Sequence, residues 1–491
     1  MTAKLSSLLN GIQIEEIIGD SDKNIVSLES DSRKATKDGI FVAVRGVTTD
    51  GHKYIPMVAS THVAAIVCEE MPSKYEKGIT YIRVKDSSVA LGELASAWYG
   101  NPSSKLKLVG VTGTNGKTTT ATLLYEMARL EGYKAGLLST VCNYIDGVAK
   151  PTTHTTPDPL TLNSLLAEMV EAGCDYAFME VSSHAATQHR IAGLTFKGGV
   201  FSNLTRDHLD YHGTVENYRD AKKAFFDMLP ESAFALVNLD DKNGIFMTQN
   251  TKAKVYTYSL RNDADFRGKI IESRLDGTLL QLNGHDVEVR FTGKFNAYNL
   301  TAVYGASILT GFKAEEVLVN MSRLVPVAGR FQTFRSKTGV TAIVDYAHTP
   351  DALVNVLDTI REIVGQKGEI TTVVGAGGNR DQGKRPQMAS EAACRSDRLI
   401  LTSDNPRFED PEEIILQMKA GLSKDELQRT LSITNRREAI RTAVAMASPG
   451  SVLLIAGKGH EPYQEVEGVR HHFDDREEVE KAFEEILNTE K

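Results

Sequence analysis

The chain has 491 residues, of which 41% are hydrophobic and 24% charged, proportions typical of a folded globular protein and not of a disordered one. Its formal net charge of −8 argues against a protein that coats nucleic acid or an anionic membrane surface. The four cysteines lie far apart without a CxxC pair, and no apolar run approaches about 18 residues, so we expect reduced thiols, no membrane insertion and a cytoplasmic location.

The first hundred residues have the pattern of a small mixed α/β domain. Short apolar runs at 39–46, 63–70 and 80–85 are separated by turn-rich and charged stretches. Segment 99–104 combines glycine, asparagine and proline and is the first credible linker. We therefore expect a first domain over residues 1–102.

A different pattern follows in the middle of the chain. Apolar runs typical of buried strands occur at 106–112, 176–181 and 198–201. Helical sequence such as 119–131 stands between them, which predicts a central domain with a largely parallel sheet over 103–332.

The segment PVAGRF at 326–331 marks a second break. Four apolar runs beyond it alternate with helix-like sequence, at 341–345, 369–374, 398–402 and 451–456. This alternation predicts a doubly wound, Rossmann-like α/β domain over 333–491. The fold expected for the whole chain is thus α/β, in three domains.

The strongest local motif is GVTGTNGKTT at 110–119, between a predicted strand and a predicted helix. Such a loop aims backbone N–H groups and a helix N-terminus at one point, which suits a polyphosphate, although Val111 replaces the first glycine of the general P-loop pattern. Lys117 would neutralise the β- and γ-phosphates and the Thr118 hydroxyl would bind Mg²⁺. A glycine turn that binds no nucleotide is the weaker alternative. The predicted ATP-binding residues of the loop are Gly113, Thr114, Asn115, Gly116, Lys117, Thr118 and Thr119.

Two polar clusters follow later strands of the same domain. Glu180 ends the strand at 176–181 and could reach a magnesium ion, while a structural hydrogen-bond role is equally open. His208 lies in the charged segment 203–212, where several candidate ligands favour a metal over the structural role usual for one histidine. Farther on, 218–226 is an amphipathic helix in which composition alone makes Lys222 and Lys223 a solvated face.

Together these motifs resemble the Mur ligase family, ATP-dependent enzymes that form amide bonds in peptidoglycan precursor synthesis. The resemblance covers most of the chain. It is carried by GTNGKTT (113–119), MEVSSHAATQHR (179–190), NLTRDHLDYHG (203–213), YRDAKKAFF (218–226), GKFNAYN (293–299), VAGRF (327–331), DYAHTPD (345–351), GAGGNRDQGKRP (375–386), SDNPRFED (403–410) and AGKGHEPYQ (456–464). Segment 30–55, SDSRKATKDGIFVAVRGVTTDGHKYI, resembles the tripeptide-forming branch of the family.

The resemblance implies a first domain for a UDP-linked substrate, a central ATPase and a last domain that brings an amino acid. The expected substrate is UDP-N-acetylmuramoyl-L-alanyl-D-glutamate. Its predicted binding residues are Ser30, Ser32, Val47, Thr48 and Thr49 at the UDP end, and Thr155, Thr156, Ser182, Gln188 and Arg190 at the muramoyl-peptide.

The resemblance also implies ATP as co-substrate and two magnesium ions. Lys222 matches the lysine that the family carbamylates to N6-carboxylysine, which reverses the solvated-face interpretation for that residue. The predicted metal-site residues are Thr118, Glu180, His208 and Lys222. Asn296 and Asn299 should face the adenine, and Arg330 and Asp345 the ribose or phosphates. The predicted catalytic residues are Lys117, Lys222, His208, Glu180 and His348, the last with an equally open structural role.

The motif Asp404-Asn405-Pro406-Arg407 bears on which amino acid is added. Meso-diaminopimelate resembles lysine with a second carboxylate, which a guanidinium can bind through two hydrogen bonds. The resemblance gives this role to Arg407. The predicted diaminopimelate-binding residues are Arg380, Asp404, Asn405, Pro406, Arg407, Gly457 and Glu461.

Three other functions remain to be weighed against this one. The same ligase could add L-lysine, the chain could be a folylpolyglutamate-synthetase-like ligase, or it could be an inactive UDP-sugar-binding regulator. The first-domain motif and DNPR disfavour the second, and the intact Lys117, Glu180, His208 and Lys222 disfavour the third. We expect the enzyme to be a monomer.

Overall fold

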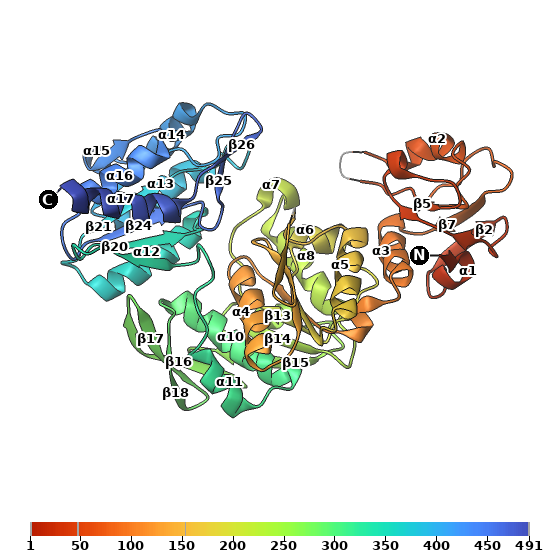
Figure 1. Ribbon diagram of the computed structural model, residues 1–491, viewed down its shortest axis with the longest axis horizontal. Coiled ribbons are helices and arrows are strands. Elements are labelled where there is room, and N and C mark those ends of the chain that lie inside the picture. The colour runs from red at the N-terminus through yellow and green to blue at the C-terminus, as the bar shows by residue number, and fades with distance from the viewer. Residues whose placement is uncertain (1, 47–48, 153, 490–491) are drawn as a thin grey trace.

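The computed structural model describes residues 2–46, 49–152 and 154–489 and shows three α/β domains in chain order (Figure 1). The first lies at one end of the molecule in red, the second in the middle, and the third at the other end in blue. The α/β fold expected from the sequence is confirmed. Among the described residues no helix is both long and apolar enough to cross a membrane.

The first domain is built on a five-stranded sheet in the order β2-β7-β6-β5-β4, parallel except for β2. Its strands are β2 (Ile14–Ile18), β4 (Leu28–Glu29), β5 (Ile40–Val42), β6 (Ala65–Cys68) and β7 (Thr80–Val84), with a separate pair β1 (Ala3–Lys4) and β3 (Asn24–Ile25). Its helices are α1 (Leu5–Leu8), α2 (Ile55–Ala59) and α3 (Ser87–Trp98), with 3₁₀ turns η1 (Ser32–Lys34) and η2 (Gly51–Tyr54). Three apolar runs of the sequence thus become β5, β6 and β7.

The central domain follows a 3₁₀ turn, η3 (Pro102–Lys105), and contains an eleven-stranded sheet. The strands in spatial order are β11 (Val148–Lys150), β10 (Asn143–Ile145), β9 (Ala135–Leu138), β12 (Tyr176–Glu180), β8 (Lys107–Thr112), β13 (Gly198–Phe201), β14 (Phe234–Asn238), β15 (Lys254–Ser259), β16 (Phe266–Arg274), β17 (Gly277–Leu282) and β18 (His285–Val289). The seven strands from β9 to β16 are parallel and only the two margins are antiparallel, so the predicted largely parallel sheet is confirmed.

Helices cover both faces of the central sheet. One apolar core joins the sheet to α4, α10 and α11, and a second joins it to α5 and α8. The helices of this domain are α4 (Lys117–Leu130), α5 (Pro159–Glu171), α6 (Ser183–Thr187), α7 (Leu209–His212), α8 (Val215–Asp227), α9 (Gly244–Met247), α10 (Lys294–Thr310) and α11 (Ala314–Met321).

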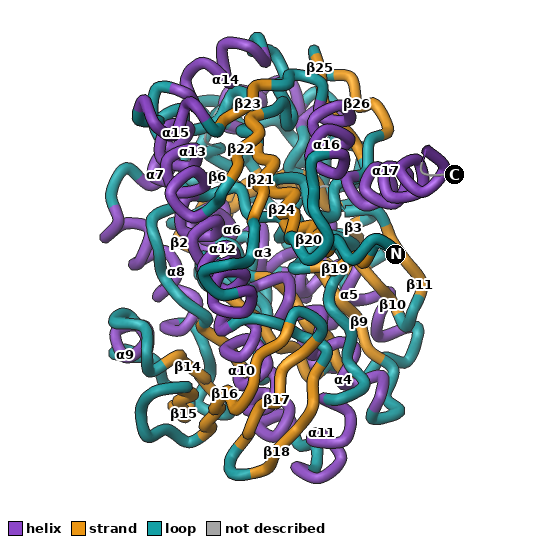
Figure 2. The backbone as a smooth tube through the Cα atoms, turned by 90° about the vertical axis from the view of Figure 1, so that its left-hand side faces the viewer, coloured by secondary structure: helices purple, strands orange, loops and turns teal. Residues whose placement is uncertain are grey.

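The last domain has a six-stranded sheet in the order β19-β20-β24-β21-β22-β23, parallel apart from β19. Its strands are β19 (Gln332–Arg335), β20 (Thr341–Asp345), β21 (Ile370–Val374), β22 (Arg398–Leu401), β23 (Thr430–Ser432) and β24 (Val452–Ala456), and a hairpin is formed by β25 (Tyr463–Val466) and β26 (Val469–His472). Its helices are α12 (Pro350–Val364), α13 (Lys384–Arg395), α14 (Pro411–Lys419), α15 (Lys424–Gln428), α16 (Arg436–Ala445) and α17 (Asp475–Thr489). Figure 2 shows α12 to α15 on one side of this sheet and α16 and α17 on the other, the doubly wound arrangement predicted from the sequence.

The two parallel sheets direct their carboxyl ends toward one shared space. Loops after β8, β12 and β13 of the central domain and after β20, β21, β22 and β24 of the last domain line a single cavity of about 860 Å³. In open α/β sheets ligands gather at this edge of the strands. The fold therefore predicts one site made by two domains.

Candidate active site

The loop between β8 and α4 has the backbone of an anion site. Gly113 and Gly116 adopt φ values of 146° and 87°, which side-chain-bearing residues rarely reach. A Cβ on Gly116 would also lie 2.4 Å from Oδ1 of Asn299, on α10. The helix then starts at Lys117, so its unpaired N–H groups point toward the cavity.

Two lysines share one carbonyl oxygen at the base of this loop. Lys117 Nζ donates to Gly113 O at 3.0 Å, and Lys222 Nζ, from α8, donates to the same oxygen at 2.7 Å. Burial lowers the pKa of Lys117, and burial together with the charge of Lys117 brings the pKa of Lys222 well below its ordinary value. The site therefore favours an uncharged amine at Lys222.

The interpretation of Lys222 and Lys223 as a solvated face is wrong for both. Lys222 is 2% exposed and Lys223 is 7% exposed. Lys223 pairs with Asp227 one turn along the helix, at 2.6 Å. Composition could not show this, because the partner that buries Lys222, the Gly113 carbonyl oxygen, lies 109 residues away in the chain.

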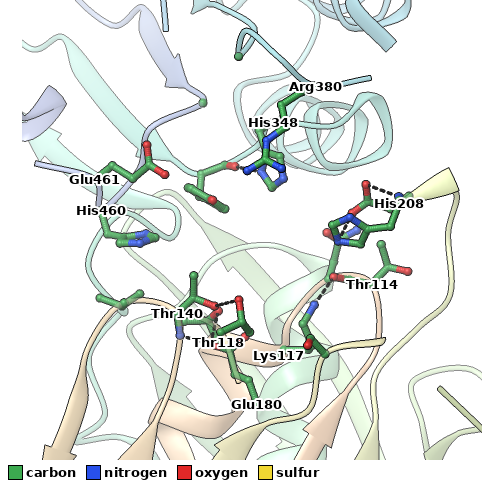
Figure 3. A pocket seen from close by; sticks show the side chains of 18 of the residues that line it. Thr114, Lys117, Thr118, Thr140, Glu180, His208, His348, Arg380, His460 and Glu461 are labelled. Carbon is green, nitrogen blue, oxygen red and sulfur yellow. Dashed lines mark hydrogen bonds and ion pairs between the residues drawn. The ribbon is translucent and has the colours of Figure 1, made fainter. Parts of the chain in front are cut away.

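Glu180 ends β12 inside the cavity, next to the start of α4. Its Oε1 accepts hydrogen bonds from the Thr118 hydroxyl at 2.9 Å and from the Thr140 backbone N–H at 2.7 Å. It is 1% exposed, so the carboxylate lies among polar hydrogen atoms and away from bulk water. Figure 3 shows Thr118, Thr140 and Glu180 together on one side of the cavity.

His208 lies on the neighbouring loop, in a left-handed backbone conformation with φ 52°. Its Nε2 is 3.5 Å from the Asp207 carboxylate, and burial, opposed by that carboxylate, lowers the pKa of the imidazole to about 4. A neutral imidazole nitrogen can accept a metal ion or a proton. Asp207 was not singled out in the sequence, although it stands inside the segment 203–213 that carries the family resemblance.

The donor set around Thr118 fits magnesium better than a metal held by protein alone. In the described part of the chain, no three His, Cys, Asp or Glu side chains converge on one metal position. Mg²⁺ is commonly bound through one or two protein oxygens, with water and substrate phosphates completing the octahedron. The paired oxygens of Thr118 and Glu180, beside a phosphate loop, match that pattern.

The last domain supplies the opposite side of the cavity (Figure 3). Arg330 reaches across from the connecting segment and donates to the Thr118 hydroxyl at 3.3 Å, with its guanidinium 4.4 Å from the Tyr346 ring centre. Nδ1 of His348 is 2.8 Å from Tyr346 O, and burial lowers the pKa of that imidazole to about 4. Asp345 accepts from two backbone N–H groups, those of Phe331 and Ala347, and so braces the connection between the domains.

A buried charge network underlies the DNPR turn. Lys458, fully buried, donates to Asn405 Oδ1 at 2.9 Å and lies 3.3 Å from Asp404. Asn405 in turn donates to Glu461 at 2.8 Å. Burial and the neighbouring Asp404 raise the pKa of Glu461. The sequence did not single out Lys458, whose only signal is its place in AGKGHEPYQ.

Arg407 lies at the edge of this network with φ 53°. Its NH1 donates to Gly378 O at 2.7 Å, and its Nε is 4.0 Å from Glu465, on β25. The side chain is 22% exposed and lines the cavity. The guanidinium thus keeps donors available to a ligand.

The cavity joins most of the predicted site residues. Those that line it are Thr114, Asn115, Gly116, Lys117, Thr118, Thr119, Thr155, Thr156, Glu180, Ser182, Arg190, His208, Lys222, Arg330, His348, Arg380, Asp404, Asn405, Arg407, Gly457 and Glu461. Residues outside the lining are Gly113, Gln188, Asn296, Asn299, Asp345 and Pro406. Gln188 instead accepts a hydrogen bond from Arg190, at 2.7 Å. Asn299 lies against Gly116 of the phosphate loop and donates to Asn296 Oδ1 at 3.4 Å.

The predicted UDP-binding residues lie apart from this cavity, in the first domain. Ser30 and Ser32 flank Asp31, whose carboxylate caps η1, and Thr49 is exposed. Val47 and Thr48 lie outside the described residues. These residues stay predictions.

Comparisons with known proteins agree along the whole chain. Residues 111–307 match the family model of the Mur ligase middle domain, and residues 329–459 match that of the Mur ligase glutamate ligase domain. A protein of Parabacteroides distasonis named UDP-N-acetylmuramoyl-L-alanyl-D-glutamate–2,6-diaminopimelate ligase is 62% identical over 98% of this chain and 99% of its own length. Its namesake from Bacteroides fragilis is 60% identical with the same coverage. A solved structure bearing this name is 33% identical, with a TM-score of 0.72 over 99% of this chain and 100% of that one.

Proposed function

The chain belongs to the Mur ligase family, and from that premise we propose that it joins meso-diaminopimelate to the D-glutamate of UDP-N-acetylmuramoyl-L-alanyl-D-glutamate at the expense of ATP. One observation carries the proposal. The phosphate loop and the DNPR turn, from different domains and almost 300 residues apart, line the same cavity. A ligase needs this arrangement, because the activated carboxyl group and the incoming amine must meet before water intervenes.

The central-domain side serves phosphoryl transfer. A carboxylate is a poor electrophile, so one of its oxygens first attacks the γ-phosphorus of ATP and gives an acyl phosphate and ADP. Lys117 and the loop N–H groups stabilise negative charge on the transferring group. Thr118, Glu180 and His208 would hold magnesium, which when bound offsets phosphate charge.

Lys222 is proposed to act as its carbamate. The neutral amine that burial favours attacks the carbon of CO₂ and, after loss of one proton, becomes an anionic oxygen ligand. Such a group at the base of the loop would replace a neutral amine beside Lys117 by an anion suited to magnesium. The modification would thereby place a negative charge next to the positive charge of Lys117.

The side of the cavity formed by the last domain binds the incoming amino acid. Arg380 and Glu461 line the cavity opposite the phosphate loop, where they suit the carboxylate and ammonium of an amino acid. Arg407 suits the second carboxylate of diaminopimelate, which lysine lacks. After the ammonium has lost a proton, the neutral amine attacks the acyl carbon, and the tetrahedral intermediate expels phosphate and loses a second proton from nitrogen to leave the amide.

An amino-acid panel tests the proposal. With ATP and UDP-N-acetylmuramoyl-L-alanyl-D-glutamate present, phosphate release should depend on meso-diaminopimelate and be slow with L-lysine or with glutamate. Fast release with lysine would favour the lysine-adding relative, and release with a folate acceptor would favour a folylpolyglutamate-synthetase-like enzyme. Binding of the UDP substrate without any phosphate release would indicate a regulator.

A further inference from the structure

An ion pair between a buried arginine and a partly exposed glutamate, which the proposed chemistry does not use, lies behind the DNPR turn. Arg385, near the start of α13, is fully buried and donates through two nitrogens to the two carboxylate oxygens of Glu409, at 2.8 and 3.0 Å. This bidentate geometry is the strongest form of an arginine–carboxylate contact. The pair therefore ties the backbone at Arg385 to the backbone at Glu409.

The two ends belong to two different substrate loops. Arg385 also donates to Gly377 O at 3.1 Å, in the loop 375–383 that carries Arg380. Glu409 closes the loop 403–410 that carries Arg407, and it accepts from the backbone N–H of Asn379. The pair thus connects the loops that follow β21 and β22.

Between the pair and the cavity, the loops are in close contact. Gly378 N–H donates to Asn405 O at 2.9 Å, and Phe408 N–H donates to Asn379 Oδ1 at 3.1 Å. A Cβ on Gly378 would lie 1.9 Å from Pro406 O, so the two backbones approach more closely here than a residue with a side chain allows. Movement of one loop must therefore displace the other.

Arg407 depends on this contact for its orientation. Its backbone has the left-handed φ of 53°, which is unfavourable for a residue with a side chain, and its guanidinium donates to Gly378 O. The guanidinium contact needs the loop 375–383 to stay in place, whereas the backbone of Arg407 is held by the hairpin, through Arg407 N–H to Glu465 O at 3.0 Å and Glu467 N–H to Arg407 O at 2.6 Å. The ion pair of the guanidinium with Glu465 is long, at 4.0 Å, and orients it weakly.

We propose that Arg385 and Glu409 are a positioning pair that orients Arg407 toward the second carboxylate of the incoming amino acid. The inference rests on the proposed function, because it assumes an amino acid with that carboxylate. The pair touches no substrate. It acts by holding two loops at one separation.

Glu409→Gln tests the pair with little change in side-chain volume. It should raise the KM for meso-diaminopimelate about tenfold, with kcat and the KM values for ATP and the UDP substrate within about twofold of wild type. Arg395→Ala is the matched control, since Arg395 is on the same helix and pairs with Asp358 away from both loops. Its kinetics should equal those of wild type.

A double variant separates positioning from general damage. In an Arg407→Ala background, Glu409→Gln should change the KM for meso-diaminopimelate by less than about twofold, because the group it orients is gone. A tenfold effect that persists in that background overturns the inference, as does an unchanged KM in the single variant or an equal loss for all three substrates. If wild type does not use meso-diaminopimelate, the proposed function fails. If wild type uses it and Glu409→Gln has no effect, only the positioning role fails.

Discussion

The phosphate end and the amino-acid end of the cavity differ in how much of each comes from one stretch of chain. At the phosphate end, residues 113–119 supply the loop, Lys117 and the helix start, while the end of β12 adds a carboxylate and α8 adds a second lysine. At the amino-acid end, side chains come from loops after β20, β21, β22 and β24, linked by Lys458 and other buried ions. The first end relies on backbone N–H groups, whereas the second relies on side chains held by other side chains. Substitutions should therefore affect turnover at the first end and amino-acid affinity at the second.

Lys117→Ala should have the largest effect. Loss of a charge aligned with the transferring phosphoryl group lowers kcat by about 10³-fold or more, while the fold is retained because Lys117 packs no core. Steady-state phosphate release together with thermal unfolding measures both quantities. Turnover within a few-fold of wild type would refute the assignment of the phosphate loop.

Lys222→Ala should come next. Without the carbamate oxygens we expect turnover to fall by at least about 10²-fold, and short-chain carboxylic acids should restore part of it by supplying oxygens in the vacated space. Activity assays with and without added acetate or propionate are the measurement. Full activity in the unsupplemented variant would mean that Lys222 has only a structural role.

Arg407→Ala should have the third-largest effect, and Arg407 lies at the other end of the cavity. Removing a bidentate contact to a carboxylate costs about 2–3 kcal/mol, so the KM for meso-diaminopimelate should rise about 30- to 150-fold while the constants for ATP and the UDP substrate hold. Initial rates over a matrix of the three substrates check this, and a parallel rise for ATP would contradict the separation of the two ends.

Lys223→Ala should have the smallest effect. Lys223 is next to Lys222 on α8 but pairs with Asp227, so its loss should lower the free energy of unfolding by about 0.5–1 kcal/mol and leave kcat within about twofold of wild type. Denaturant unfolding and the phosphate assay give the two values. A loss of turnover comparable to that of Lys222→Ala would show that the whole helix, and not one amine, is needed.

The same contrast explains what the sequence could predict. Features formed by one continuous stretch of chain could be predicted from the sequence. Strands β13 and β20 have the predicted bounds, and the phosphate loop lies where its glycines indicated. The burial of Lys222 was accessible only through family resemblance, because charge and helical spacing describe a solvated face equally well. Lys458 and the Arg385–Glu409 pair could not be found from spacing, since their partners are 24 to 54 residues away and become neighbours only when the parallel sheet forms. The hairpin of β25 and β26, which brings Glu465 beside Arg407, likewise has no strong alternation in its sequence.

In the proposed mechanism, one cavity first activates a carboxylate by phosphorylation and then delivers an amine to it. The most direct test is to label both carboxylate oxygens of the D-glutamate in the UDP substrate with ¹⁸O and analyse the inorganic phosphate by mass spectrometry. Because the attacking oxygen leaves with the phosphoryl group, each amide bond formed with meso-diaminopimelate should yield one phosphate carrying one ¹⁸O. Amide formation accompanied by unlabelled phosphate would contradict the account.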